Sequence, residues 1–203
     1  MSELLSIEGL GVPLPIDNLD TDQIMPKQFL RIIDKAGLQA GLLYDLRFDA
    51  DGAVREECVL NQSAYRGANI LLGGANFGCG SSREHAVWGL QQFGFQAVIA
   101  SSFAEIFYSN AMNNRLLLVQ LDQSAINALM AQGSAGPITV SIDIAKQQVI
   151  GPAGDVFAFP IGARHKKMVI EGMDTIDLTL SGLPAIEAFE SRHYAQHAWA
   201  SVL

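Results

Sequence analysis

The sequence predicts an α/β fold in which a parallel core is extended by antiparallel strands, and two observations support this prediction. The first is a regular alternation of short apolar runs with helix-forming segments, at 69–72, 83–93, 96–100, 102–113, 116–119 and 125–131. Alternation at this spacing is typical of parallel strands joined by helices. The second is a change of pattern after Gly136 to short alternating runs, at 138–142, 148–150 and 156–159, which indicates antiparallel strands.

The ends of the chain complete this outline. Residues 4–16 are expected to be extended and to lead into a polar turn at 17–22, and residues 28–47 are expected to form two short helices, broken near Gly37 and Gly41. Ser102 and Glu105 have capping-box spacing, which predicts a helix start there. A terminal helix is expected from Pro184 to Trp199. The chain of 203 residues is therefore expected to be a single domain over 1–203, with a C-terminal helical extension at about 184–203.

Composition narrows the classes of function. The net charge of −8 argues against nucleic-acid binding, which requires a basic face, so any acidic ligand must be bound by local positive charge. No stretch approaches ~18 uninterrupted apolar residues, so no membrane span is expected. The N-terminus lacks a basic stretch followed by an apolar run, and the two cysteines, Cys58 and Cys79, lie in different segments. These features lead us to expect a cytoplasmic protein.

The most informative segment is a glycine-rich loop at 76–86, which runs from a predicted strand into a predicted helix. The backbone of Gly78, Cys79 and Gly80 gives a ligand close access to main-chain N–H groups, and a helix N-terminus favours negative charge. Arg83 is suited to binding a carboxylate through two hydrogen bonds. The loop therefore predicts an anion site. The alternative is that the glycines serve tight packing and the serines cap the helix.

The same loop carries a resemblance to a known family. Its core reads Gly80-Ser81-Ser82-Arg83-Glu84-His85, and it is similar to the signature of the aconitase swivelling domain. Three further segments resemble that family in the same order, at 20–26, at 103–110 and at 172–176. The resemblance covers nearly the whole chain, and an eleven-residue match is far more specific than a lone glycine motif.

This resemblance implies a swivelling β/β/α domain and an enzyme that works with a second chain. The partner would be a large subunit carrying a [4Fe–4S] cluster, whose open iron site acts on the departing hydroxyl of the substrate. No cofactor is expected on this chain, because two cysteines are too few to hold such a cluster. The reaction would remove and re-add water on a small 2-hydroxy dicarboxylic acid. The expected acid is an isopropylmalate, and homoaconitate, a methylmalate or a dimethylmalate remain alternatives, as does a non-catalytic anion-binding relative.

By position in the family motifs, Ser81 corresponds to the catalytic base, and Ser82 and Arg83 correspond to contacts with a substrate carboxylate. Asp22 corresponds to a catalytic acidic residue that is expected to pair with a group on the other chain. A serine is a weak base unless its alkoxide is stabilised, which backbone N–H groups and Arg83 can do in a dry site. Arg31 is a further candidate for substrate binding, and we expect it to point outward or to pair with Asp34.

Several other residues allow two interpretations. Cys79 is a candidate nucleophile or a small packing residue. His85 is a candidate base or a residue that fixes the loop. His193 and His197 have the spacing of metal ligands on one helix face, but a solvated face is the simpler interpretation, and no metal site is expected. The basic run at 164–167 is interpreted as a solvated helix face or as a source of substrate or partner contacts.

Overall fold

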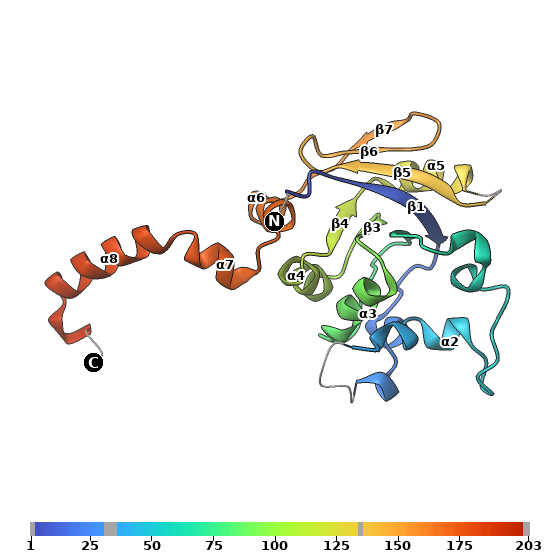
Figure 1. Ribbon diagram of the computed structural model, residues 1–203, viewed down its shortest axis with the longest axis horizontal. Coiled ribbons are helices and arrows are strands. Elements are labelled where there is room, and N and C mark those ends of the chain that lie inside the picture. Colours follow the sequence, from blue (N-terminus) through green and yellow to red (C-terminus); the bar gives the residue numbers. More distant parts are fainter. Residues whose placement is uncertain (1–2, 31–35, 134–135, 201–203) are drawn as a thin grey trace.

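The structure is a computed structural model that describes residues 3–30, 36–133 and 136–200. Within these residues the centre is a seven-stranded sheet with the order β4-β3-β2-β1-β5-β6-β7 (Figure 1). The strands are β1 Ser6–Leu14, β2 Ile70–Gly73, β3 Ala97–Ala100, β4 Leu117–Gln120, β5 Ile138–Asp143, β6 Gln148–Ile150 and β7 Val156–Ala158. β1 to β4 are parallel, and β5 to β7 continue the sheet in antiparallel pairs. The predicted α/β class, with its parallel and antiparallel parts, is therefore confirmed.

Two faces of the parallel strands are buried, and each packs against a different layer. Every residue of β2 and β3 is buried, which explains why both strands read as uninterrupted apolar runs. Leu71 and Val98 pack on the face covered by α3 and α4. Ile70 and Ile99 point the opposite way and pack with Val140 of β5 and with α5. The sheet thus curls so that its antiparallel strands cover one face of its parallel strands.

The helices largely follow the predicted order. They are α1 Thr21–Ile24, α2 Tyr44–Arg47, α3 His85–Phe93, α4 Glu105–Asn113, α5 Gln123–Gln132, α6 Ala163–Glu171, α7 Thr175–Leu180 and α8 Leu183–Gln196. Short 3-10 turns add Lys27–Phe29, Leu38–Ala40, Val59–Asn61, Ser63–Tyr65 and Ala198–Ala200. α1 and α7 were not predicted, and the described part of the segment at 28–47, where two short helices were expected, holds 3-10 turns and the four-residue α2. None of the helices in the described part of the chain is long and apolar enough to cross a membrane.

Two predicted helix starts are wrong. Ser102 does not cap α4, because its hydroxyl accepts a hydrogen bond from the backbone N–H of Asn76 at 2.8 Å, and Ala104 occupies the N-cap position without a side-chain bond. α3 begins at His85 rather than Arg83, so the glycine-rich loop is two residues longer than predicted. In the first case the loop at 74–84 binds a hydroxyl that the sequence pattern predicts as a helix cap, and in the second it includes two residues that the pattern predicts as helical.

The basic run at 164–167 lies on α6 and is only partly solvated. His165 is buried, at 2% exposure, and its Nδ1 lies 3.3 Å from the hydroxyl of Tyr108 on α4. Lys166 donates from Nζ to the carbonyl of Ala145 at 2.7 Å. Burial lowers the pKa of His165 from 6.5 to about 4, and a hydrogen bond with the Leu116 backbone opposes this effect only in part.

The low pKa of His165 predicts a pH-dependent stability. Between about pH 6.5 and 4 the unfolded chain binds a proton that the folded chain excludes, so stability is complete above pH 6.5 and falls as the pH decreases. The full loss is about 3 kcal/mol at most. Urea unfolding at a series of pH values should show this slope in the wild type and a smaller slope in His165→Gln. His197→Gln, which changes an exposed imidazole, is the control. Equal slopes in the wild type and His165→Gln would contradict the assignment.

Candidate active site

Two loops meet at the carboxyl ends of the adjacent parallel strands β1 and β2. Backbone hydrogen bonds join them in sequence: Asn18 N–H to the carbonyl of Ala75, Gly78 N–H to the carbonyl of Leu19, and Thr21 N–H to the carbonyl of Cys79, each at 2.8 Å. Open α/β sheets commonly bind ligands at the carboxyl ends of their strands. The glycine-rich loop and the segment at 20–26 are therefore one structural unit, although about 60 residues separate them in the sequence.

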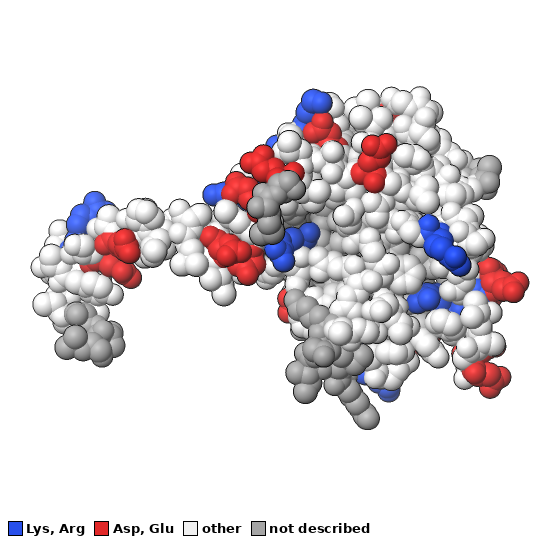
Figure 2. Space-filling view, in the orientation of Figure 1, with Lys and Arg blue, Asp and Glu red and all other residues white. Residues whose placement is uncertain are grey.

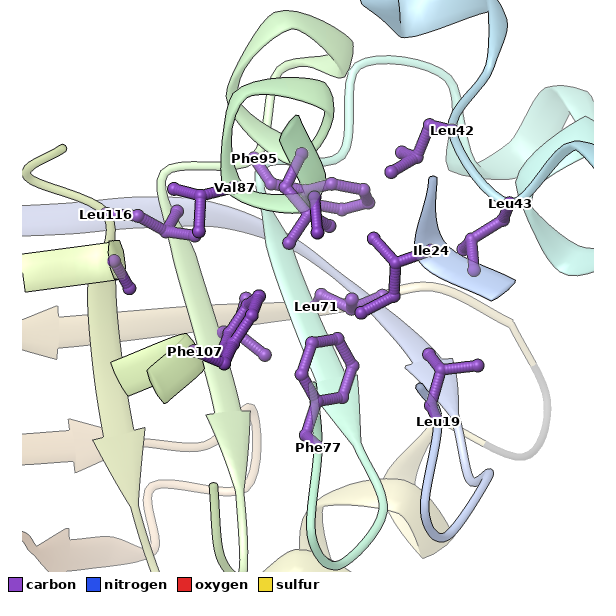
Figure 3. Close-up of a cluster of buried hydrophobic side chains, with 14 of the residues drawn as sticks. Leu19, Ile24, Leu42, Leu43, Leu71, Phe77, Val87, Phe95, Phe107 and Leu116 are labelled. Carbon is purple, nitrogen blue, oxygen red and sulfur yellow. The ribbon is translucent and has the colours of Figure 1, made fainter. Parts of the chain in front are cut away.

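A buried aromatic cluster supports the loop from below. Phe77 is fully buried and packs edge-on against Phe103 and Phe107, with ring centroids 6.2 and 5.4 Å apart. Figure 3 shows Phe77 and Leu19 at the base of the two loops, pointing into the same apolar core as Phe107. The packing of Phe77 in this core holds the glycine-rich loop against the parallel strands.

Gly78 is required where the loop passes over this core. Its φ is 77°, a left-handed conformation that side chains rarely adopt, and an added Cβ would lie 2.2 Å from Cγ of Phe107. The next residue, Cys79, is half-buried, and its Sγ donates to the carbonyl of Asn18 at 3.3 Å. The packing interpretation of Cys79 therefore has a specific contact.

Thr21 holds Ser81 in place. The side chain of Thr21 is almost fully buried, at 1% exposure, at the start of α1. Its Oγ1 accepts from the backbone N–H of Ser81 at 3.0 Å and lies 3.1 Å from both the carbonyl oxygen and Oγ of the same serine. One buried hydroxyl thus contacts the backbone N–H, the carbonyl oxygen and the side-chain hydroxyl of Ser81, while the serine itself is exposed.

Arg83 and Asp22 form an ion pair at the mouth of a shallow cavity. Arg83 Nη1 contacts Asp22 Oδ1, and the arginine side chain is the more buried of the two. The cavity has a volume of about 280 Å³, and its lining comprises Asp22, Pro26, Lys27, Gln28, Asp45 and Arg83. Two cationic and two anionic side chains therefore face one small space in a chain that is strongly acidic overall.

The far side of the loop is attached to α4 and to the start of α3. Asn110 donates to the carbonyl of Ser82 at 3.3 Å. Asn114, at the end of α4, links this helix to Glu84, because its side-chain Nδ2 donates to the Glu84 carboxylate. Its side-chain Oδ1 accepts from Nε1 of Trp88 at 2.8 Å. Glu84 is also the N-cap residue of α3, where the helix dipole stabilises a negative charge. Glu84 is thus a structural residue of the loop.

The four residues that the sequence predicted for the site, Ser81, Ser82, Arg83 and Asp22, lie near one another in the structure. Asp22 pairs with Arg83 of its own chain, and its expected pairing with a group on a second chain stays a prediction. Thr21, Lys27 and Asp45 were not singled out. The signal for Thr21 was its position inside the Asp-Thr-Asp motif. Nothing local in the sequence marks Lys27 or Asp45, because only the fold brings them to the cavity.

Arg31 was a candidate for substrate binding, and the structure describes the three residues that precede it, 28–30. Gln28 lines the cavity. Phe29 packs instead against Tyr44, with ring centroids 5.2 Å apart, and approaches Gly41 so closely that an added Cβ there would lie 2.5 Å from the ring. Arg31 and its expected partner Asp34 lie outside the described residues.

The remaining candidates take other positions. His85 packs against Trp88, with ring centroids 4.7 Å apart. The ring centroids of His193, in α8, and of His197, its C-cap residue, lie 4.8 Å apart. Cys58 and Cys79 are both free thiols. Within the described parts of the chain, no group of three or more His, Cys, Asp or Glu side chains is arranged to hold a metal ion.

Comparison with known proteins gives a consistent result. A family model described as Aconitase C-terminal domain matches residues 1–124. The 3-isopropylmalate dehydratase small subunit 1 of Chromobacterium violaceum is 55% identical over 194 residues, which cover 95% of this chain and 91% of that protein. The 3-isopropylmalate dehydratase small subunit of Phenylobacterium zucineum is 44% identical, and the alignment covers 98% of each chain.

A solved structure agrees with these relatives. The crystal structure of 3-isopropylmalate dehydratase from Methanocaldococcus jannaschii superposes with a TM-score of 0.66 and 27% sequence identity, covering 90% of this chain and 99% of that one. The resemblance to the aconitase superfamily that the loop motif indicated is therefore confirmed.

Proposed function

We propose that this chain, which belongs to the family of 3-isopropylmalate dehydratase small subunits, provides one part of a hydro-lyase active site. The reaction exchanges 2-isopropylmalate and 3-isopropylmalate by removing and re-adding water, a step of leucine biosynthesis. The observation that carries the proposal is the geometry of one loop: a serine hydroxyl fixed by a buried threonine, two residues from an arginine at the mouth of a cavity.

The other part of the active site is proposed to lie on a large subunit. We also propose that the two subunits work in the cytoplasm. This chain has only Cys58 and Cys79, and both are free, so its residues do not fit a [4Fe–4S] cluster, which needs three or four thiolates. We therefore assign the cluster to the large subunit. This chain would contribute proton transfer and carboxylate binding.

Ser81 is proposed as the base that takes a proton from a substrate carbon. An alkoxide at Ser81 Oγ needs a hydrogen-bond donor, and the Thr21 hydroxyl lies 3.1 Å away. In the resting state that hydroxyl can donate to the carbonyl of Ser81, which is equally close. When Oγ becomes negative, the same O–H can turn toward it, because donors to the charged form stabilise it.

Arg83 is proposed to bind a substrate carboxylate while Asp22 fixes its orientation. A guanidinium has five N–H donors in a planar fork, so one edge can hold Asp22 and the other can bind the substrate. Ser82 follows Ser81 in the loop and is proposed to add a hydroxyl donor to the same carboxylate. Lys27 supplies a second positive charge at the cavity, which suits a substrate with two carboxylates.

The test of this function is reconstitution with a cluster-bearing large subunit and a panel of 2-hydroxy acids. The isolated chain is expected to be colourless, iron-free and inactive, and the mixture is expected to prefer isopropylmalate over homoaconitate. Ser81→Ala should lower kcat roughly 1,000-fold or more with a modest change in KM. Ser82→Ala, a neighbouring change of the same size, should act mainly on KM. Near-normal kcat in Ser81→Ala would remove the proposed mechanism.

Replacing the arginine separates substrate binding from chemistry. Arg83→Lys keeps the charge but loses the planar fork, so KM should rise by roughly tenfold or more. Arg55→Lys is the matched control, since the Arg55 guanidinium donates to the carbonyl of Phe48 and Arg55 is not among the residues that line the cavity. Steady-state kinetics of the reconstituted enzyme would show equal KM values for both variants if Arg83 does not bind substrate.

Thr21 is predicted to act through Ser81, which a pair of substitutions can test. Thr21→Val keeps the shape but removes the hydroxyl, and kcat should fall roughly 10- to 100-fold with little change in KM. Thr21→Ser keeps the hydroxyl and should retain most of kcat, even though the lost methyl group leaves a small cavity. Unfolding measurements on both variants separate stability from activity. If the loss of kcat followed stability rather than the presence of the hydroxyl, Thr21 would have only a structural role.

A further inference from the structure

The C-terminal part of the chain forms an arm in which no described residue is buried against the rest of the protein. The arm consists of residues 175–200, with α7, α8 and the final 3-10 turn, and it projects away from the sheet after α6 (Figure 1). Neither α7 nor α8 contains a buried residue, although both are fully within the described residues. This is unlike α3, α4, α5 and α6 of the body, each of which has buried residues.

The root of the arm is firmly attached. Arg115, in the turn after α4, donates from Nη1 to the carbonyl of Gly172 at 2.6 Å. Asp174 then caps α7, accepting from the backbone N–H groups of Ile176 and Asp177 at 2.8 Å. The arm therefore leaves the body at a defined place, next to the helix whose Asn110 contacts the active-site loop.

Large apolar side chains are exposed along the arm. In α8, Leu183, Ile186 and Phe189 follow one another at three-residue spacing, which places them on one side of the helix. Phe189 is 57% exposed, and Trp199 near the end of the arm is 84% exposed. Two residues of α7, Ile176 and Leu180, add to this surface. Figure 2 shows that most of the visible surface of the arm is neither acidic nor basic.

Such a surface is unfavourable in water without a partner. Isolated helices shorter than ~12–15 residues are marginally stable, and most helical stability comes from packing of an apolar side. α8 has 14 residues and no such packing within this chain. Aromatic side chains are also the residue types that contribute most to binding energy at protein interfaces. The arm thus has the properties of an interface helix.

We propose that the arm docks into an apolar groove on the large subunit, an inference that rests on the proposed function. The arm is shared by small subunits: alignments with relatives that bear this name cover 98% of the chain, so they necessarily include most of residues 175–200. The arm also lies beyond the last strand of the sheet and beyond α6, so it is an addition to the body of the protein. A segment that projects from the body and is common to these small subunits is suited to holding the partner that such a subunit requires.

The test compares two charge substitutions on neighbouring residues of α8 in the full-length chain. Phe189→Glu places a carboxylate on the apolar side, whereas Ala188→Glu places the same group on a position that lies about 100° further around the helix. The equilibrium constant for dissociation from the large subunit is measured for the wild type and both variants. We expect a rise of roughly tenfold or more for Phe189→Glu and of less than about threefold for Ala188→Glu.

Activity distinguishes the outcomes. At saturating large subunit, Phe189→Glu should recover the kcat of the wild type, because the arm is separate from the site at Ser81. If the wild type binds and supports turnover but Phe189→Glu binds equally well, the docking proposal is overturned and the proposed function stands. If Phe189→Glu alters only self-association of the isolated chain, the arm contacts a second copy instead. If the wild-type chain neither binds a large subunit nor supports turnover, both proposals fail.

Discussion

The pairing of two loops at the ends of β1 and β2 is the constraint on which the whole candidate site depends. Thr21 and Ser81 are 60 residues apart, and they meet only because their strands are parallel neighbours and three backbone hydrogen bonds continue the pairing beyond the sheet. Phe77 anchors this pair of loops in the core, and Gly78 has neither the φ nor the space for any side chain. A shift in the register of β1 against β2 would separate the serine from its threonine.

The site divides into a rigid part and an open part, and the division has a chemical reason. Thr21 is buried and fixes the position of Ser81, whose hydroxyl is proposed to take the proton. Asp22, Lys27 and Asp45 are exposed around the cavity, where a substrate and a partner must enter. A serine alkoxide requires a dry surrounding, yet Ser81 is exposed in this chain. In the proposed mechanism the second chain would therefore exclude water as well as bring further groups.

Much of the fold could be predicted from the sequence because its signals are local. The buried strands read as apolar runs, and the antiparallel strands as alternating ones. The prediction that Ser102 caps a helix was wrong because a serine hydroxyl can accept from other N–H groups as well. Here it accepts from the backbone N–H of Asn76, which is distant in the sequence. The sequence indicated a solvated position for His165 because its neighbours in the chain are charged. In the structure α6 turns one side toward the core, and His165 is buried on that side with Met168 and Val169. Contacts such as Arg83 with Asp22, or Lys27 at the cavity, depend on the tertiary fold, and no local pattern encodes them.

Substrate access would place a further demand on the proposed site between two chains. The substrate would enter between them and water would then be excluded, so the contact at the site would open and close in each turnover. If that contact were the sole attachment, every opening would risk dissociation. An attachment outside the site changes this, because a tethered partner returns from a high effective concentration. The arm leaves the body beside α4 rather than from the loop at 74–84, and it contributes no side chain to the cavity. A docked arm would thus allow the site to open while the two chains remain together.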